Sequence, residues 1–469
     1  MLFKYCPLIF LFNRYVAGGI DMLFFNHGFN FLNDELNCTA VEKFNTSTRW
    51  IKQKIDNFNT KDGRVWKMRY FERLSFYKPN GPIYLFLGGE DEVCPLWAAK
   101  GIMYELAKET NGAMYVSEHR YYGKSIPLNG TDAEAFKYLS ARQALADNAN
   151  LLKTIKSKSQ YKKSKVVVIG GSYPGNLAAW MRLLYPNLVD AALASSAPVL
   201  AKMDFYEYLE KVNDNYEQYG TKNCLATIRK IFKRYEKLMQ SREGIEELKR
   251  EENICEKCDM TLAENQHTFF MSKAYVFKNN SQNGRIEHIK NHCERLLNSS
   301  KTETTGENCT CYGLDAMNGL SVNDKNNTWN LPWTYQTCNE FGYFQTTSSY
   351  EQPFKNYIPL EFYIRICQKL FGPEFDEERV NKGVAEVNNL YGGLNPNVTN
   401  VVFSNGDLDP WSTLSILKDL THNAPAVVIP RSSHCRDLLS NEPDDIEELR
   451  DARKYIKKII KKWIGVTVW

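Results

Sequence analysis

One stretch of the sequence joins a β-forming run to two glycines and a serine. Residues 166–169 are Val-Val-Val-Ile, Gly170-Gly171-Ser172 follows, and Tyr173-Pro174-Gly175-Asn176 can begin a helix. A strand that turns sharply into a helix with a serine at the corner is the layout of a nucleophile elbow. An ordinary strand–turn–helix gives a similar pattern, and Pro174 departs from the Gly-x-Ser-x-Gly spacing. The pattern favours Ser172 as a nucleophile without establishing it alone.

A nucleophilic serine needs a base, and the chain has seven histidines. His434 follows the apolar run at 426–429, whereas His422 precedes that run. Functional groups of an open α/β sheet lie beyond the carboxyl ends of its strands. We therefore expect His434 to be the base.

The orienting acid is expected after the strand-like run at 400–404. Asp407 and Asp409 both follow this run. We favour Asp409, because the proline that follows it restrains the backbone. The order Ser172, Asp409, His434 along the chain is that of an α/β-hydrolase triad. This order predicts an acyl-enzyme mechanism that needs no metal and no cofactor.

Several segments taken together resemble one family. They are Gly-Gly-Ser-Tyr-Pro-Gly at 170–175, Asn-Gly-Asp-Leu-Asp-Pro-Trp-Ser at 405–412, Ser-His-Cys at 433–435, Gly-Pro-Ile-Tyr-Leu-Phe-Leu-Gly-Gly-Glu at 81–90 and Trp-Thr-Tyr-Gln-Thr-Cys-Asn-Glu-Phe-Gly at 333–342. These segments resemble the lysosomal Pro-Xaa carboxypeptidase family of serine peptidases, and within it the thymus-specific serine protease branch. The resemblance implies an exopeptidase that cleaves short peptides after proline.

Analogy with α/β-hydrolase geometry indicates where an oxyanion would bind. One donor should be the backbone N–H of Tyr173, and a second should come from Gly89 or Glu90 in the loop after the run at 82–87. These two donors would face the developing charge on the substrate carbonyl oxygen.

An exopeptidase must also bind one terminus of its substrate. Glu340 is a candidate for binding an amino terminus, and Arg120 or Lys124 for binding a carboxylate. Trp411 is a further candidate for substrate contact. The sequence leaves the carboxypeptidase and dipeptidyl peptidase modes both open, and it leaves internal salt bridges open for each charged residue.

Twelve cysteines indicate an oxidising compartment, because eight of them fall between 224 and 367. The resemblance implies a disulfide between Cys338 and Cys367 and suggests, more weakly, a pairing of Cys224 with Cys293. Cys94 and Cys435 are candidates for lying close together. No second ligand pair has zinc spacing, so disulfide bonding is favoured for the pair Cys255-x-x-Cys258.

Glycosylation sequons also indicate passage through the secretory pathway. Eight asparagines stand in such sequons: Asn37, Asn45, Asn129, Asn279, Asn298, Asn308, Asn326 and Asn397. Residues 1–30 form a poorly defined N-terminus with a candidate signal segment, and its apolar run is too short to span a bilayer. The expected location is lysosomal, endosomal or secreted.

Alternating apolar runs and helical patterns predict a parallel sheet over 64–199, within an α/β-hydrolase fold that carries a large, mostly helical cap insertion. We expect the fold's first part at 31–199, the disulfide-rich cap at 200–394 and the second part at 395–469. Residues 228–250 should form a long charged helical stretch, 280–308 a flexible surface region, and the lysine-rich C-terminal segment a helix on the sheet.

The net charge of +4 is small for 469 residues, and the basic residues are dispersed. Nucleic acid is therefore not expected as a partner; peptide substrates are, and a homodimer is a possible assembly. Two other functions stay open from the residues: an esterase or lipase on the same fold, and an inactive hydrolase that serves as a binding protein.

Overall fold

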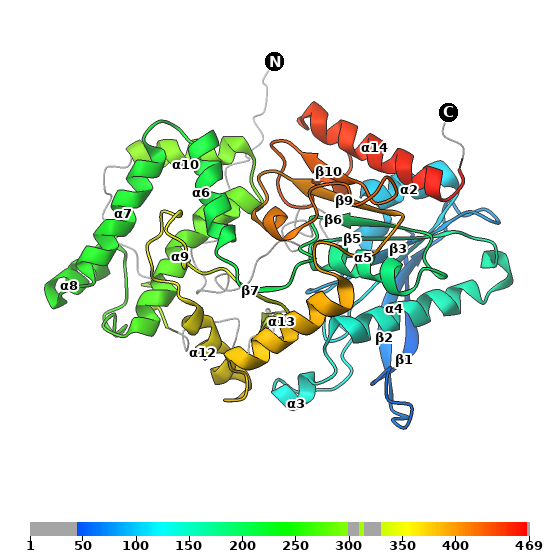
Figure 1. Ribbon diagram of the computed structural model, residues 1–469, viewed down its shortest axis with the longest axis horizontal. Coiled ribbons are helices and arrows are strands. Elements are labelled where there is room, and N and C mark those ends of the chain that lie inside the picture. Colours follow the sequence, from blue (N-terminus) through cyan, green and yellow to red (C-terminus); the bar gives the residue numbers. More distant parts are fainter. Residues whose placement is uncertain (1–44, 299–308, 314–329, 467–469) are drawn as a thin grey trace, which may run out of the picture.

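The computed structural model describes residues 45–298, 309–313 and 330–466, and a mixed sheet of eight strands organises them (Figure 1). The strand order is β1-β2-β4-β3-β5-β6-β9-β10. Their bounds are β1 Ser47–Lys54, β2 Val65–Arg73, β3 Ile83–Leu87, β4 Ala113–Ser117, β5 Val166–Gly171, β6 Ala191–Ser195, β9 Val401–Gly406 and β10 Ala426–Ile429. From β4 to β10 all neighbouring strands are parallel, whereas β2 is antiparallel to both β1 and β4.

The central strands β3, β4, β5, β6 and β9 are buried along their whole length. Each is a short apolar or small-residue run, which is what a parallel strand covered on both faces requires. The strand order, with the first strands antiparallel and a sharp strand–helix turn after β5, is that of an α/β-hydrolase fold. The fold class expected from the sequence is therefore confirmed.

Helices cover both faces of the sheet. Helices α2 (Gly101–Thr110) and α14 (Glu447–Trp463) pack on one face, and α4 (Ala141–Lys156) and α5 (Tyr173–Leu184) pack on the other. Side chains of each strand alternate between the two cores, as the pleat demands. The C-terminal helix lies on the sheet as expected, and two of its lysines form ion pairs with Glu105 and Glu109 of α2.

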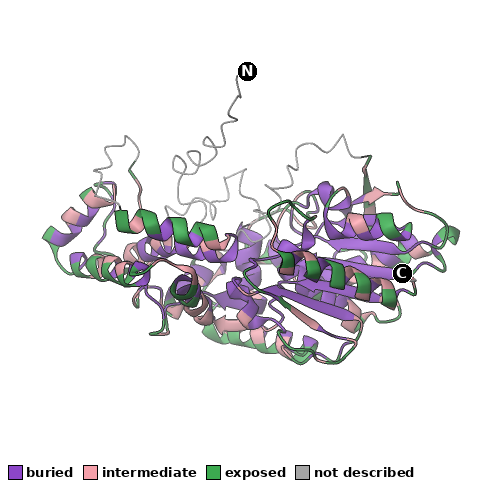
Figure 2. Ribbon diagram, turned by 90° about the horizontal axis from the view of Figure 1, so that it is seen from above, coloured by how far each residue is buried: buried purple, intermediate pink, exposed green. Residues whose placement is uncertain are grey.

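A long, mostly helical segment enters the fold between β6 and β9, beside the sheet in Figure 1. Its described helices are α6 Glu207–Tyr219, α7 Cys224–Leu238, α8 Arg242–Glu251, α9 Ala263–Gln282, α10 Ile286–Asn298, α11 Asn330–Gln336, α12 Leu360–Phe371 and α13 Glu377–Tyr391. The short strands β7 (Lys202–Asp204) and β8 (Gly342–Phe344) pair with each other in this segment. Figure 2 shows buried residues between the helices and exposed ones along their outer faces.

The structure bears out one sequence prediction about this segment in part and contradicts another. The charged stretch at 228–250 is helical but divided in two, because α7 ends at Leu238 and Ser241 caps a new helix, its hydroxyl accepting from Gly244 N–H at 3.0 Å. The region 280–298 is not a loose surface segment either. It contains the end of α9 and all of α10, and buried Cys293 of α10 is bonded to Cys224; residues 299–308 lie outside the described part.

Three disulfides lie within the described residues. They are Cys224–Cys293, Cys255–Cys309 and Cys338–Cys367. The pairing of Cys338 with Cys367 is the one that the family resemblance implied, and Cys224 with Cys293 matches the weaker suggestion. Cys255 and Cys258 are not bonded to each other, and Cys258, Cys311 and Cys435 carry free thiols. Cys94 is disulfide-bonded, so it is not paired with Cys435.

Of the eight sequon asparagines, Asn45, Asn129, Asn298 and Asn397 are exposed, and Asn279 on α9 is half-buried. Asn37, Asn308 and Asn326 lie outside the described ranges, as does the candidate signal segment. Among the described residues, no helix is both long enough and apolar enough to cross a bilayer.

Candidate active site

Ser172 occupies the corner between β5 and α5. Its backbone has φ 60° and ψ −134°, a conformation that costs a non-glycine residue energy and is typical of functional corners. The Ser172 N–H donates to the Ser195 carbonyl oxygen at 2.9 Å, which ties the corner to the neighbouring strand β6. The residue is 8% exposed, so it is buried but not wholly cut off from the surface.

Pro174 fits this corner without strain on the helix. It lies in the first turn of α5, where no N–H is needed for an intrahelical hydrogen bond. Its ring packs on the loop after β3, since a Cβ added to Gly89 would lie 2.3 Å from Pro174 Cγ. The absence of a side chain at Gly89 therefore compensates for the proline and holds the Gly89–Glu90 loop against the start of α5.

Asp409 and His434 are in direct contact. His434 Nδ1 lies 2.6 Å from Asp409 Oδ2, and both side chains are fully enclosed. The other carboxylate oxygen of Asp409 accepts from Trp411 N–H at 3.0 Å, so the acid also caps the short helix Pro410–Leu414. Asp407 turns elsewhere, accepting from Arg431 N–H at 2.6 Å. The structure thus brings Asp409, and not Asp407, to the histidine.

Asp409 is the main charged neighbour of His434. Burial lowers the pKa of His434, but the charge of Asp409, the neighbouring Cys435 and the hydrogen bond to Asp409 outweigh burial and raise the pKa well above its ordinary value. The hydrogen bond on Nδ1 fixes the ring so that Nε2 is the free nitrogen. Within the described residues, His434 Nε2 is buried and has no hydrogen-bond partner.

The loop that carries His434 packs against the serine corner. Cys435 N–H donates to Ser196 Oγ at 2.9 Å, and a Cβ added to Gly171 would lie 2.9 Å from Cys435 Sγ. Because Gly171 precedes Ser172 and Cys435 follows His434, the serine and histidine side chains start from adjacent stretches of backbone. The N–H of Tyr173, the first residue of α5, has no intrahelical acceptor and lies next to this junction.

Tyr173 belongs to a buried polar network behind the serine. His119 Nε2 lies 2.9 Å from Tyr173 Oη, and Gln336 Nε2 donates to the same oxygen at 3.1 Å. Tyr122 Oη donates to Gln336 Oε1 at 2.6 Å. Burial lowers the pKa of His119 to about 3, so this imidazole is neutral. The network fixes the ring of Tyr173 and with it the residue that follows the serine.

Glu90 is a buried carboxyl group at the same junction. Burial raises its pKa to about 7, and the charge of His434 opposes that shift. Its Oε2 has no hydrogen-bond partner among the described residues. The loop expected to supply an oxyanion donor therefore also holds an acid that titrates near neutral pH.

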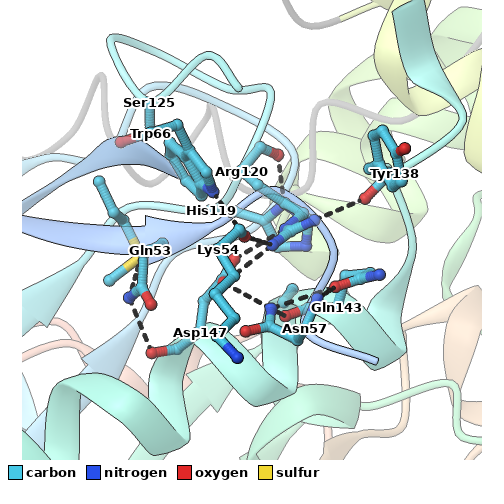
Figure 3. Close-up of polar contacts among 12 residues, drawn as sticks. Gln53, Lys54, Asn57, Trp66, His119, Arg120, Ser125, Tyr138, Gln143 and Asp147 are labelled. Atoms are coloured by element: carbon cyan, nitrogen blue, oxygen red, sulfur yellow. Dashed lines mark hydrogen bonds and ion pairs between the residues drawn. The ribbon is translucent and has the colours of Figure 1, made fainter. Parts of the chain in front are cut away.

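Glu340 and Arg120, which the sequence offered as candidates for binding a substrate terminus, make contacts inside the fold. Glu340 accepts from Ala141 N–H at 3.1 Å on both of its oxygens, at the first residue of α4. Burial raises its pKa to about 8. Arg120 binds Asp147 through Nε and Nη2 at 2.7 and 2.8 Å, and it donates to the backbone oxygens of Ile55 and Tyr138 (Figure 3). These contacts favour structural roles for both residues. Lys124 is exposed.

Trp411 lies beside the histidine and binds a residue that sequence reasoning missed. Its Nε1–H donates to Gln282 Oε1 at 3.1 Å, and Gln282 is the last residue of α9 in the helical insertion. The Gln282 carbonyl oxygen in turn accepts from His434 N–H at 2.8 Å. No local signal marks Gln282, because its role depends on a contact across about 150 positions of sequence.

Comparison with known proteins places the chain in a peptidase family. Residues 53–456 match the serine carboxypeptidase S28 family. The chain is 32% identical over 444 residues to thymus-specific serine protease of Mus musculus, which covers 88% of this chain and 87% of that protein. It is 28% identical over 447 residues to lysosomal Pro-X carboxypeptidase of Bos taurus, with 89% and 88% covered.

Among solved structures, proline iminopeptidase of Mycobacterium smegmatis aligns with 89% of this chain and 99% of that chain, at a TM-score of 0.37 and 11% identity. The family match covers most of the chain and includes every residue of the site described above. The chain belongs to the serine carboxypeptidase S28 family and is a serine-type peptidase.

Proposed function

We propose that the protein is a serine exopeptidase that hydrolyses short peptides after proline, with Ser172, Asp409 and His434 as its catalytic triad. The observation that carries the proposal is the enclosed contact of His434 Nδ1 with Asp409, which leaves His434 Nε2 free beside the serine corner. An imidazole held in this way can take a proton from a serine hydroxyl.

In the acylation step, Ser172 Oγ attacks the substrate carbonyl carbon and its proton passes to His434 Nε2. The C–N bond then breaks as His434 gives that proton to the leaving amine. A water molecule repeats the sequence on the acyl-enzyme and releases the acid product and the free serine. Asp409 stabilises the imidazolium form of His434 in both halves of the reaction.

The developing oxyanion would be held by backbone donors on two segments. The Tyr173 N–H lies at the start of α5, and the loop at Gly89–Glu90 packs on Pro174 of the same turn. Donors fixed before the reaction stabilise charge without reorganisation, which makes this arrangement effective.

A cluster of buried aromatic rings that begins at Tyr173, the residue after the serine, supports a preference for proline. The Tyr173 ring lies 5.4 Å from that of Trp333 and 5.3 Å from that of Phe341, between centroids, and Tyr343 lies 5.3 Å from Trp411. A compact, apolar pyrrolidine ring packs well on such faces. The Pro-X carboxypeptidase name of one relative agrees with this preference.

The cysteine pairing and the exposed sequons support a place in the secretory pathway, either in the endosomal or lysosomal lumen or outside the cell. The name of the lysosomal relative agrees with this location.

Incubation with a mixed library of short peptides, with products identified by mass, tests the proposed activity. We expect single cleavages near a terminus with proline before the scissile bond. Matched ester substrates serve as the comparison. Faster hydrolysis of esters with no cleavage of peptides, or efficient digestion of large folded proteins, would contradict the proposal.

A further inference from the structure

The helical insertion carries two buried donor side chains at the end of the helix that contacts the histidine loop. Both lie on α9, four residues apart and thus on the same helix face: Lys278 and Gln282. Neither belongs to the catalytic machinery proposed above, and both are buried, with exposures of 6% and 1%.

The orientation of the Gln282 carboxamide is fixed by its partners. Trp411 Nε1–H, which can only donate, and Tyr208 Oη–H both point at Gln282 Oε1, at 3.1 and 2.6 Å. The oxygen must therefore face these two residues, and the Nε2 group faces the other way. In the described part of the chain, Nε2 is buried without an acceptor, which is a costly condition for a donor.

Lys278 presents a second donor one turn earlier along the helix. Its Nζ lies 5.3 Å from the centroid of the Tyr208 ring, the same tyrosine that binds Gln282. No hydrogen bond or ion pair to the ammonium is present among the described residues. Burial alone lowers the pKa of Lys278 to about 7, with no neighbouring carboxylate to oppose it. Burying a cation without a counter-charge costs free energy. A lysine in such a position points to a ligand that supplies the missing negative charge.

We propose that Lys278 and Gln282 form the receptor for the C-terminal carboxylate of the peptide, so that the protein acts as a carboxypeptidase. The proposal rests on the serine peptidase function proposed above and names the substrate terminus which that site binds. The ammonium and the Nε2 group would each donate to a carboxylate oxygen, and the Tyr208 and Trp411 rings would form the wall between them.

The position of Gln282 suits this role. The carboxylate of a single departing residue lies about 4–5 Å from the carbonyl carbon under attack, by bond lengths alone. Gln282 adjoins the proton-transferring residue directly, since its carbonyl oxygen accepts from His434 N–H at 2.8 Å. The two free groups are donors, which suits a carboxylate and not an amino terminus.

The test compares N-benzyloxycarbonyl-Pro-Phe with its C-terminal amide. Wild type should cleave the acid at least about 10-fold more efficiently than the amide, as expected for a charge-assisted contact. In Lys278→Met, kcat/KM for the acid should fall about 10- to 100-fold while that for the amide stays within about 3-fold. Gln282→Glu keeps an acceptor for Trp411 but repels a carboxylate, so it should reduce cleavage of the acid more than that of the amide.

Lys273→Met is the matched control, because Lys273 lies on the same helix and pairs with Glu252 at 2.6 Å. It should leave the ratio of acid to amide cleavage unchanged. Lys278→Arg, which keeps the charge, should retain a preference for the acid. Thermal unfolding reports folding separately: Lys278→Met removes a buried charge and should not lower the midpoint, whereas Lys273→Met should lower it.

The receptor and the peptidase proposal can fail separately. An unchanged ratio of acid to amide cleavage in Lys278→Met would contradict the carboxylate receptor but not the peptidase activity. A wild type that prefers Ala-Pro-p-nitroanilide, which has a free amino terminus, would do the same. That second result would point to Glu90 as an amine-binding group. Calorimetric binding of the two peptides to Ser172→Ala needs no chemistry. Equal affinity for acid and amide in that variant would overturn the receptor, and tighter binding of the acid that Lys278→Met abolishes would support it even without hydrolysis.

Discussion

His434 Nδ1 contacts Asp409 Oδ2 at 2.6 Å, whereas Asp407, two positions earlier, turns its carboxylate to the backbone of Arg431. Both aspartates follow the same strand, β9. Their side chains point in different directions, although only one residue separates them in the sequence. The short helix at Pro410–Leu414, capped by Asp409, fixes this difference. Substituting each aspartate in turn therefore distinguishes the two candidate acids.

Asp409→Asn should lower kcat by roughly 10⁴-fold, because an amide cannot stabilise the imidazolium and favours the wrong tautomer of His434. Asp407→Asn is the matched control and should change kcat by no more than about 3-fold, since its oxygen only accepts from Arg431 N–H. Steady-state kinetics on one proline-containing peptide measure both. A larger loss in Asp407→Asn than in Asp409→Asn would show that the acid is misassigned.

The pH profile should follow the ionisation of His434. The general base must be neutral, so kcat/KM should fall as the pH is lowered through the His434 pKa, which Asp409 raises. In Asp409→Asn the raising charge is gone, and the fall should move to lower pH. Rates of acylation by a serine-directed probe, measured from about pH 4 to about pH 9, give both profiles.

Glu90 is a second group that could titrate in this pH range, because burial raises its pKa to about 7. A variant at Glu90 therefore serves as the control for the pH profile. Glu90→Gln removes this ionisation and should leave the acid-side fall in place. A fall that disappears in Glu90→Gln and does not move in Asp409→Asn would assign the titration to Glu90 instead.

Glu340→Ala should reduce stability rather than substrate selection. It leaves Ala141 N–H at the start of α4 without its acceptor, at a cost of about 1–3 kcal/mol. The thermal midpoint should fall, and the preference between peptides with free and blocked amino termini should not change. Glu351→Ala, at an exposed loop position, is the control for stability. A stable variant that loses selectivity for free amino termini would restore Glu340 as an amine-binding residue.

The disulfide Cys338–Cys367 joins the segment after α11 to α12, at a sequence separation of 29. Removing it by a double change to serine should lower the free energy of unfolding by about 3–4 kcal/mol, by the loop-closure relation. Peptide mapping without reduction should recover the linked peptides. A Cys338 that alkylates before reduction would show that the bond does not form.

Local pattern predicted much of the sheet and the serine corner. The run Val166–Ile169 followed by glycines is both a buried strand and a turn with no room for side chains, so composition and structure coincide there. The run Ala426–Ile429 became β10 with the expected bounds, and the position of His434 after it placed the histidine near the serine. In each case the deciding information lies within about ten residues of the side chain concerned.

The partners of charged residues could not be predicted in that way. Arg120 and Lys278 both look like ordinary helix or loop cations in the sequence. In the structure, the hydrogen-bond donors of Arg120 bind Asp147 and backbone oxygens, whereas Lys278 is buried without a counter-charge. Their environments arise from tertiary packing of distant segments, which periodicity does not encode. The break between α7 and α8 was missed for a different reason: Ser241 acts as a cap only because the chain bends there.

The most direct test of the whole account is labelling with a fluorophosphonate probe followed by mapping of the modified peptide. Wild type should carry the probe on Ser172 alone, and Ser172→Ala should lose all labelling while keeping the thermal midpoint of the wild type, since the substitution removes only a hydroxyl at the end of the sheet. Labelling that persists in Ser172→Ala, or that maps to another serine in the wild type, would contradict the central claim that Ser172 is the nucleophile.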